Sequence, residues 1–272
     1  MKCIFDVIKK KRKFIGREKE LLAMEQLLTA KKEDWGIIHF YGPAGMGKTV
    51  LLQQFALIHK HLPVIYIDGH NGFRSAQDFL TAVHKQLVDK HMLTAESLEL
   101  NVIEELKRII SKHAVFVLLL DGMDQCHGIL DWLKDEFLKI LPINVRIYSA
   151  GRLPLDDWQT DFGWETIVKN IKINPFSKTE WTQYANACGI TDARQLYQIG
   201  FISQGIPLAV SLICNWIVEY GNLERLSEAY GRHFMALFDK YLLNEQSLDG
   251  VNSTLLALAS LTYTFDQEML EH

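Results

Sequence analysis

The stretch Gly42-Pro43-Ala44-Gly45-Met46-Gly47-Lys48-Thr49 fits the pattern G-x-x-x-x-G-K-[ST] and decides the fold. The apolar run over residues 36–41 is typical of a buried strand, and residues 50–56 continue as a helix with an apolar side. A glycine-rich turn between a strand and a helix lets successive backbone N–H groups point at one phosphate, and the helix dipole adds partial positive charge there. The sequence therefore predicts a phosphate-binding loop.

The loop predicts binding of both a nucleotide and Mg²⁺. Lys48 is expected to reach the β- and γ-phosphates, and the Thr49 hydroxyl is expected to bind Mg²⁺. An ordinary strand–turn–helix connection is the alternative, and the flanking strand and helix patterns disfavour it. The loop residues that we predict to contact the nucleotide are Gly42, Pro43, Ala44, Gly45, Met46, Gly47, Lys48, Thr49 and Val50.

Two aspartates follow the most apolar stretch of the chain. Residues 114–120 are continuously apolar, which is typical of a strand covered on both faces in the centre of a parallel sheet. Asp121 comes next and is predicted to complete, through water, the Mg²⁺ shell that Thr49 begins. Asp124 is placed to orient or deprotonate the attacking water. A helix N-cap or turn is the alternative role for Asp121, and a turn residue is the alternative for Asp124.

Arg152 comes shortly after a further predicted strand at residues 144–149. In a parallel sheet this position lies at the ligand-binding edge, where an arginine can hold a γ-phosphate with two hydrogen bonds. A surface arginine at a strand end is the alternative. The predicted catalytic residues are therefore Lys48, Asp124 and Arg152, and the predicted metal ligands are Thr49 and Asp121.

Strands and helices alternate along the chain as far as Asn174-Pro175, where the strand signal stops. Two more strands are predicted at residues 63–68 and 166–173, and helices are predicted at 17–30, 75–90 and 95–112. This alternation predicts an α/β fold with a mainly parallel five-stranded sheet flanked by helices. Pro207 suits the first turn of a later helix, one of four predicted at residues 178–188, 191–203, 206–220 and 223–243.

The composition excludes several other classes of protein. The 272-residue chain has a net charge of −4, which gives no overall bias toward nucleic acid. Four scattered cysteines give neither a disulfide framework nor a zinc pattern and favour the cytoplasm. Ten histidines show no metal-ligand spacing, and His59 and His61 are expected on the surface. No apolar run reaches the ~20 residues that a membrane span needs, so no membrane partner is expected.

The basic run Lys-Lys-Lys-Arg-Lys at residues 9–13 is the strongest charge cluster. We interpret it as a solvated linker, with a nuclear localisation signal or a nucleic-acid-binding arm as the alternatives.

Several separated segments together resemble one known family, the signal-transduction ATPases with numerous domains (STAND). This family includes NACHT and NB-ARC proteins and is related to the AAA+ ATPases. The matching segments are Phe-Ile-Gly-Arg-Glu-Lys-Glu-Leu at residues 14–21, the phosphate loop, the acidic strand end at 118–124, the strand and arginine at 144–152, and Gln-Gly-Ile-Pro-Leu-Ala at 204–209. In the family, the Gly-Arg-Glu segment lies against the adenine, and the proline of the Gly-x-Pro motif packs on the nucleotide. The resemblance therefore implies nucleotide contacts for Ile15, Gly16, Arg17 and Pro207.

The resemblance implies an ATP- and ADP-binding switch with slow Mg²⁺-dependent ATP hydrolysis, which controls conformation and oligomerisation in signalling or defence. In the family, the nucleotide lies between the α/β domain and a helical lid. ADP keeps these parts closed, and ATP opens them for self-association. Effector and sensor modules normally flank this core and are expected outside this chain. The family often places an acid directly after the second Walker B aspartate, but this chain has Gln125 there, so slow turnover is expected.

The composition shift and the resemblance together suggest the domain limits. We expect a basic N-terminal segment at residues 1–13, a nucleotide-binding α/β domain at 14–175 and a helical lid domain at 176–228. Residues 229–272 are expected to begin a winged helix or to form additional helices. The last three residues, Leu-Glu-His, resemble the start of a vector-encoded tag, which would mean that the natural chain continues.

Two other functions stay open at this point. A DNA-associated AAA+-like ATPase of the origin-recognition or archaeal type also carries a Gly-Arg-Glu segment. The basic run at residues 9–13 is its direct support, although nucleic acid is not the favoured partner. A scaffold that holds a structural nucleotide and never hydrolyses it is the third possibility.

Overall fold

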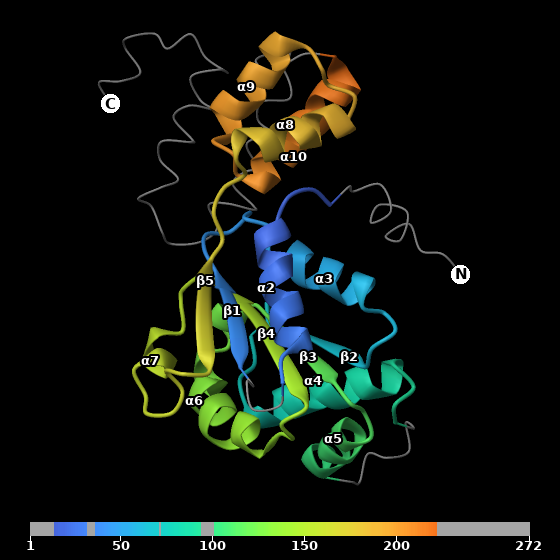
Figure 1. Ribbon diagram of the computed structural model, residues 1–272, viewed down its shortest axis with the longest axis vertical. Coiled ribbons are helices and arrows are strands. Elements are labelled where there is room, and N and C mark those ends of the chain that lie inside the picture. Colours follow the sequence, from blue (N-terminus) through green and yellow to red (C-terminus); the bar gives the residue numbers. More distant parts are fainter. Residues whose placement is uncertain (1–13, 32–35, 71, 94–100, 222–272) are drawn as a thin grey trace. The chain divides into compact units, whose positions relative to one another are not determined.

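The computed structural model describes residues 14–31, 36–70, 72–93 and 101–221 (Figure 1). Its backbone contacts divide the chain into two units. The α/β unit comprises Arg17–Pro43 and Lys48–Ile173, and the helical unit contains the described residues of Met1–Gly16, Ala44–Gly47 and Asn174–His272. The predicted basic segment at 1–13, the predicted helix at 223–243 and the predicted winged helix at 229–272 lie outside the described residues.

The α/β unit contains a five-stranded sheet, which confirms the predicted parallel architecture. All pairings are parallel, and the strand order is β2-β3-β4-β1-β5. The strands are β1 (Ile37–Tyr41), β2 (Val64–Asp68), β3 (Phe116–Asp121), β4 (Val145–Gly151) and β5 (Val168–Lys172). Several of the predicted strand ends were wrong by one or two residues, because pairing with neighbouring strands rather than apolarity sets them. β3 starts two residues later than its apolar run and includes Asp121, and β4 continues to Gly151.

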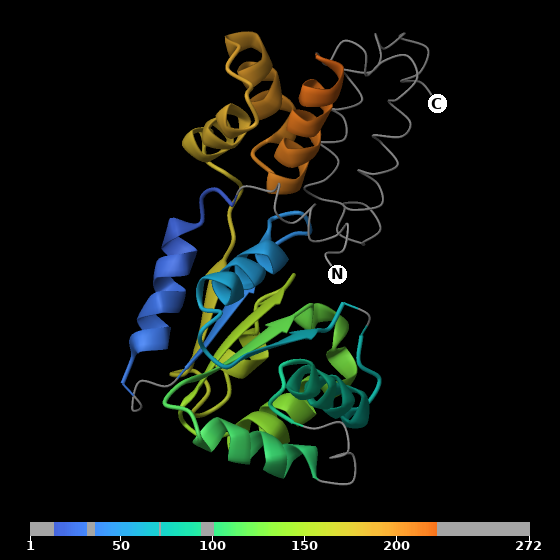
Figure 2. The ribbon, with the colours of Figure 1, turned by 90° about the vertical axis from the view of Figure 1, so that its right-hand side faces the viewer.

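Helices cover both faces of this sheet, as predicted (Figure 2). One face carries α2 (Glu18–Thr29) and α3 (Lys48–Ile58), and the other carries α4 (Ala76–Asp89) and α5 (Val102–Ser111). The start of α4 is fixed by a capping box, in which the Ser75 hydroxyl accepts from the Asp78 N–H and the Asp78 carboxylate accepts from the Ser75 N–H.

Strand β3 is buried along its whole length, and its side chains alternate between the two faces of the sheet. Phe116, Leu118 and Leu120 belong to the core on the α4 and α5 side. Asp121 therefore faces the opposite side, where its neighbour Tyr66 also contacts Gln53 of α3. The alternation of a buried strand thus carries the Asp121 carboxylate to the face that α3 covers.

The irregular segment after β3 was not predicted. It contains the short 3₁₀ turns Met123–Gln125 and His127–Ile129, α6 (Leu130–Trp132), a π-helical turn at Leu133–Phe137 and a last 3₁₀ turn at Leu138–Ile140. Each piece is too short for a 3.6-residue period to appear. The segment is nevertheless part of the core, because the Phe137 ring lies edge-on against Phe79 with centroids 5.1 Å apart. The short α7 (Asp156–Gln159) was missed for the same reason.

The described residues of the helical unit form three helices, α8 (Lys178–Ala187), α9 (Ala193–Ser203) and α10 (Pro207–Tyr220). Pro207 occupies the first turn of α10, as predicted, where its missing N–H costs nothing. The unit has its own core, to which each helix contributes; its fully buried members are Ala185, Ile199, Ala209, Val210, Ile213 and Cys214. Within the described ranges, no helix has the length and apolarity that crossing a membrane requires.

The prediction that His59 lies on the surface was wrong. His59 follows α3 and is only 8% exposed, and its Nε2 lies 2.6 Å from Glu25 Oε1 on α2. Its ring also packs against Phe55, with centroids 4.5 Å apart. Because α2 covers the end of α3 on the same face of the sheet, the histidine is enclosed. His61 is exposed, as expected.

A buried arginine joins α2 to the sheet. Arg146 of β4 is 2% exposed, and its Nε and Nη2 donate to the carbonyls of Leu27 and Ala30 at the end of α2, at 2.9 and 2.8 Å. Its Nη1 donates to the carbonyls of Ile143 and Val145. The guanidinium therefore supplies donors to two carbonyls at the end of α2, where the helix offers few backbone N–H groups.

We expect Arg146→Met to lower the free energy of unfolding by about 3 kcal/mol, because it removes a buried cation that donates to four buried or partly buried carbonyls. Urea unfolding of the purified chain measures this. The matched control is Arg108→Met at an exposed position of α5, where the arginine of the ion pair with Glu105 is solvated and the change should stay within about 0.5 kcal/mol. Equal effects of the two substitutions would contradict a stabilising role for Arg146.

Candidate functional site

The loop between β1 and α3 has the backbone that its glycines predict. Gly42, Gly45 and Gly47 adopt φ values of +147°, +76° and +86°, which side chains with a Cβ rarely adopt. A Cβ on Gly42 would also lie 3.1 Å from the Ile173 carbonyl oxygen. The loop thus needs glycine at these positions for conformation and, at Gly42, for space.

Lys48 is the first residue of α3, and its side chain folds back over the start of the loop. Its Nζ donates to the carbonyls of Gly42 at 2.7 Å and Pro43 at 2.9 Å. Burial lowers the pKa of Lys48 to about 8, while the negative charges of Asp124 and Asp121 act in the opposite direction and the positive charge of Arg152 adds to the lowering. The structure therefore brings these four predicted side chains within electrostatic reach of one another.

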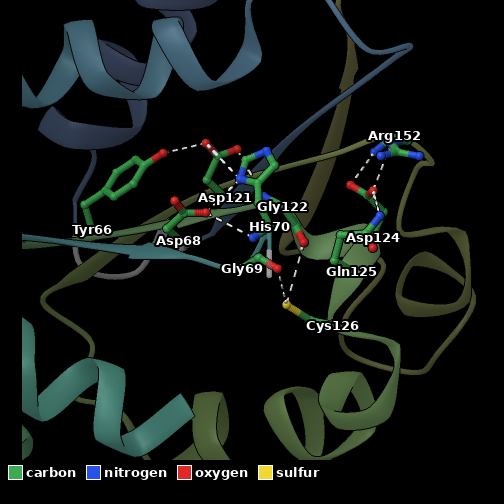
Figure 3. A network of polar contacts seen from close by, with 10 residues as sticks. All are labelled: Tyr66, Asp68, Gly69, His70, Asp121, Gly122, Asp124, Gln125, Cys126 and Arg152. Atoms are coloured by element: carbon green, nitrogen blue, oxygen red, sulfur yellow. Dashed lines mark hydrogen bonds and ion pairs between the residues drawn. The ribbon is translucent and has the colours of Figure 1, made fainter. Parts of the chain in front are cut away.

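Asp121 ends β3 and is held by two hydrogen bonds (Figure 3). The side chain is 2% exposed; its Oδ2 accepts from the Tyr66 hydroxyl at 2.5 Å, and its Oδ1 accepts from the Gly122 N–H at 3.0 Å. Burial, followed by the charge of Asp121, raises the pKa of Tyr66, so the phenol keeps its proton and donates it to the carboxylate. The carboxylate is thereby fixed in orientation before any ligand binds.

A second carboxylate lies beside Asp121 at the same edge of the sheet. Asp68 ends β2 and is paired in register with Asp121. Its Oδ1 lies 2.7 Å from His70 Nδ1, and that nitrogen is 4.0 Å from Asp121 Oδ2 (Figure 3). Sequence reasoning did not single out Tyr66, Asp68 or His70. The available signal was Asp68, an acid at the end of a predicted strand, as Asp121 is.

The donors at this edge fit a magnesium ion. Thr49 in the first turn of α3 offers a hydroxyl and Asp121 a carboxylate, and Mg²⁺ prefers such oxygen ligands while keeping several waters. In the described part of the chain, no group of three or more His, Cys, Asp or Glu side chains could hold a metal ion. A cation here would therefore need water or phosphate oxygens to complete its shell.

Asp124 and Arg152 are paired with each other. Asp124 Oδ1 accepts from the Arg152 backbone N–H at 3.1 Å, and Oδ2 lies 3.1 Å from Arg152 Nε (Figure 3). The Gln125 amide donates to the same Oδ2 at 3.0 Å. The residues predicted as the base and as the γ-phosphate contact thus hold one another, which sequence reasoning did not foresee.

Sequence reasoning also missed His39, a buried histidine in the middle of β1. It is 0% exposed, with Nδ1 2.8 Å from Ser149 Oγ and Nε2 3.0 Å from the Leu153 carbonyl oxygen. Burial lowers the pKa of His39 to about 4, so the ring is neutral at pH 7. Because a carbonyl only accepts, Nε2 carries the proton and Nδ1 accepts from Ser149. A histidine inside an apolar strand was the signal available in the sequence.

The residues implied by the family resemblance are found at two helix starts. Gly16 and Arg17 both have positive φ, and Arg17 precedes the first residue of α2 with its Nη1 3.5 Å from Glu20 Oε1. Ile15 is half-buried just before them. Pro207 begins α10 in the helical unit. Nucleotide contact by these four residues stays a prediction.

Comparisons with known proteins identify the fold. A family described as an AAA domain matches residues 31–154. Cdc6p from Pyrobaculum aerophilum is similar in structure, with 16% sequence identity and a TM-score of 0.52 over 79% of this chain and 67% of that chain. The Drosophila ORC bound to DNA shows 15% identity and a TM-score of 0.56 over 86% and 68%. None of the curated proteins matches the sequence significantly.

These likenesses establish a P-loop α/β fold of the AAA type, which confirms the predicted fold class. At 15–16% sequence identity, these similarities are evidence for the fold and not for the function. The narrower resemblance to STAND, NACHT and NB-ARC proteins stays a prediction.

We expect His39 to make stability depend on pH. Its pKa is about 4 in the folded chain and about 6.5 when unfolded, so between these values only the unfolded chain binds the proton and stability falls as pH falls. From pH 7.5 to pH 5 the loss due to this residue is about 2 kcal/mol. His39→Gln should remove that part of the pH dependence in urea unfolding, whereas His61→Gln on the surface should not. Identical pH profiles for wild type and His39→Gln would exclude this assignment.

Proposed function

We propose that this chain binds ATP and ADP with Mg²⁺, hydrolyses ATP slowly and acts as a nucleotide-operated conformational switch. The observation that carries the proposal is the arrangement around Lys48. The lysine lies over a glycine loop at a helix N-terminus and feels the charges of Asp121, Asp124 and Arg152. Such an arrangement suits a phosphate chain with a cation at one side.

Different residues of this chain would contact the phosphates and the Mg²⁺ ion. The N–H groups of the loop at residues 42–49 hold phosphate oxygens, and Lys48 exchanges its two carbonyl contacts for β- and γ-oxygens. Thr49 and Asp121 hold Mg²⁺, which would neutralise charge on the β- and γ-phosphates. Ile15, Gly16, Arg17 and Pro207 contribute further nucleotide contacts, as in the family that the sequence resembles.

The pairing of Asp124 with Arg152 is a reason to expect slow hydrolysis. A general base must accept a proton from water, but both oxygens of Asp124 already accept hydrogen bonds, from Arg152 and Gln125. A γ-phosphate competes for the guanidinium of Arg152, since arginine pairs with phosphate as well as with carboxylate. ATP and ADP therefore favour different pairings of Arg152, and this difference in contacts is what a nucleotide switch requires.

We further infer that the switch controls self-association in signalling or defence in the cytoplasm. Its input and output modules would then lie outside this chain. This part of the proposal rests on the sequence resemblance.

Lys48→Ala should weaken binding of Mg·ATP and Mg·ADP by at least about 100-fold, because it removes two or more charge-assisted hydrogen bonds to phosphate. Isothermal titration calorimetry measures this. Lys60→Ala, an exposed lysine beyond the end of α3, is the matched control and should bind as wild type does. Unchanged affinity of Lys48→Ala would refute the phosphate-loop assignment.

Asp124→Asn should slow single-turnover ATP hydrolysis about tenfold or more while nucleotide affinity changes little, because the amide keeps the shape but accepts no proton. Phosphate release measured with saturating Mg·ATP checks this, with the exposed Asp157→Asn as control. Equal rates for Asp124→Asn and wild type would remove Asp124 as the base. No release by the wild type over hours, with tight binding intact, would support the scaffold alternative.

A DNA-associated ATPase is the second candidate. It is favoured by the fold likeness to the DNA-bound Drosophila ORC and by the basic run at residues 9–13. Fluorescence anisotropy with duplex and single-stranded DNA decides between the two. Affinity that falls steeply between about 50 and 200 mM salt favours this candidate, and no binding at the lower salt excludes it.

A further inference from the structure

We propose that His39 is a positioning residue, which acts together with Ser149 and Asn170 to fix the backbone segment at residues 152–155. The fixed segment places the Arg152 side chain where it can pair with Asp124 or with a γ-phosphate. The inference rests on the proposed function, because it assigns a second layer of residues to that site. His39 does this without touching the nucleotide.

The three residues form a polar row across the sheet. His39 of β1 is paired in register with Ser149 of β4 on one side and with Asn170 of β5 on the other. His39 and Ser149 are 0% and 1% exposed, and their side chains share a 2.8 Å hydrogen bond. Strand positions this deeply buried normally carry apolar side chains, as Ile37 and Phe40 of the same strand do.

The row and the phosphate loop hold the segment after β4 at three points. His39 Nε2–H donates to the Leu153 carbonyl at 3.0 Å, and the Leu155 N–H donates to Asn170 Oδ1 at 3.1 Å. The Arg152 carbonyl accepts from the N–H of Gly42, the first residue of the phosphate loop, at 3.2 Å. The backbone from Arg152 to Leu155 is therefore anchored to β1, to β5 and to the loop.

The energetic cost of the row indicates that these anchors matter. A buried imidazole or amide destabilises the fold unless its polar atoms are hydrogen-bonded. Among the described residues, Asn170 Nδ2 is one of two buried side-chain nitrogen or oxygen atoms without a partner. Its Oδ1 nevertheless holds the Leu155 N–H. An apolar residue at position 170 would avoid that cost but would release the segment.

The ring of His39 also packs closely against Gly151 at the end of β4. A Cβ on Gly151 would lie 3.1 Å from His39 Cε1 and 3.5 Å from the Asp124 backbone nitrogen. The ring and the Asp124 turn thus lie close to Gly151, the residue immediately before Arg152. Any shift of this segment changes the distance from the Arg152 N–H and Nε to Asp124, both now 3.1 Å.

The test compares His39→Leu, which removes both hydrogen bonds, with His39→Gln, whose amide can still donate to the Leu153 carbonyl. Each is made in the wild-type chain and in Arg152→Ala, and the readouts are single-turnover ATP hydrolysis and the ratio of ATP to ADP affinity. We expect His39→Leu to change both readouts about tenfold, with ADP affinity itself within about threefold of wild type. His39→Gln should recover most of the loss. In the Arg152→Ala background, His39→Leu should have no further effect, because residues that act through one another are not additive.

An equal loss from His39→Leu in both backgrounds would overturn the proposal, since the histidine would then act through general stability. Unchanged readouts in the wild-type background would overturn it as well. If His39→Leu does not fold, Ser149→Ala takes its place, because it removes the donor that orients the ring.

A readout without nucleotide separates this proposal from the proposed function. Hydrogen exchange of the peptide at residues 149–156 should quicken in His39→Leu, while the peptide at residues 24–31 should keep its rate. Faster exchange with no nucleotide binding by the wild-type chain would refute the proposed function alone. Unchanged exchange in a chain that binds nucleotide would refute the role of His39 alone.

Discussion

All five strands of the sheet run in the same direction, and the site depends on this constraint. Parallel strands place every carboxyl end at one edge, so the residues that follow each strand meet there without any local signal in the sequence. The phosphate loop follows β1, Asp121 ends β3 and Arg152 follows β4. Because β4 lies between β1 and β3, the Arg152 segment separates the loop from the acidic turn and contacts both.

Buried polar groups have separate roles along the sheet. Arg146, near the start of β4, hydrogen-bonds backbone carbonyls and fastens α2, which is a role in stability. Asp121, at the end of β3, has its carboxylate oriented by Tyr66 at the edge of the sheet that carries the candidate site. His39 lies in the middle of its strand, and its Nε2 is hydrogen-bonded to the Leu153 carbonyl in the segment that follows Arg152. Each group costs free energy to bury, and each has its hydrogen bonds satisfied by a neighbour.

Apolar runs and glycine turns were enough to predict the five strands, the flanking helices and the loop. Strand order was not predictable, because a linear pattern carries no information about which strands are neighbours. The pairing of Asp124 with Arg152 joins residues 28 apart in the chain and follows from that order. His59 was misplaced because its burial comes from α2, a distant segment. The turns between Met123 and Ile140 are too short to have a period, so nothing in the sequence marked them.

The contacts of Lys48 turn anion binding into an exchange of partners. With its ammonium already held by the carbonyls of Gly42 and Pro43, the gain from a phosphate is the difference between two sets of hydrogen bonds. A small anion such as inorganic phosphate replaces these contacts with little surplus. Under the proposed function, a nucleotide would add the contacts of its remaining phosphates, its sugar and its base, so selectivity for the whole ligand would come from the lysine's existing bonds as much as from its charge.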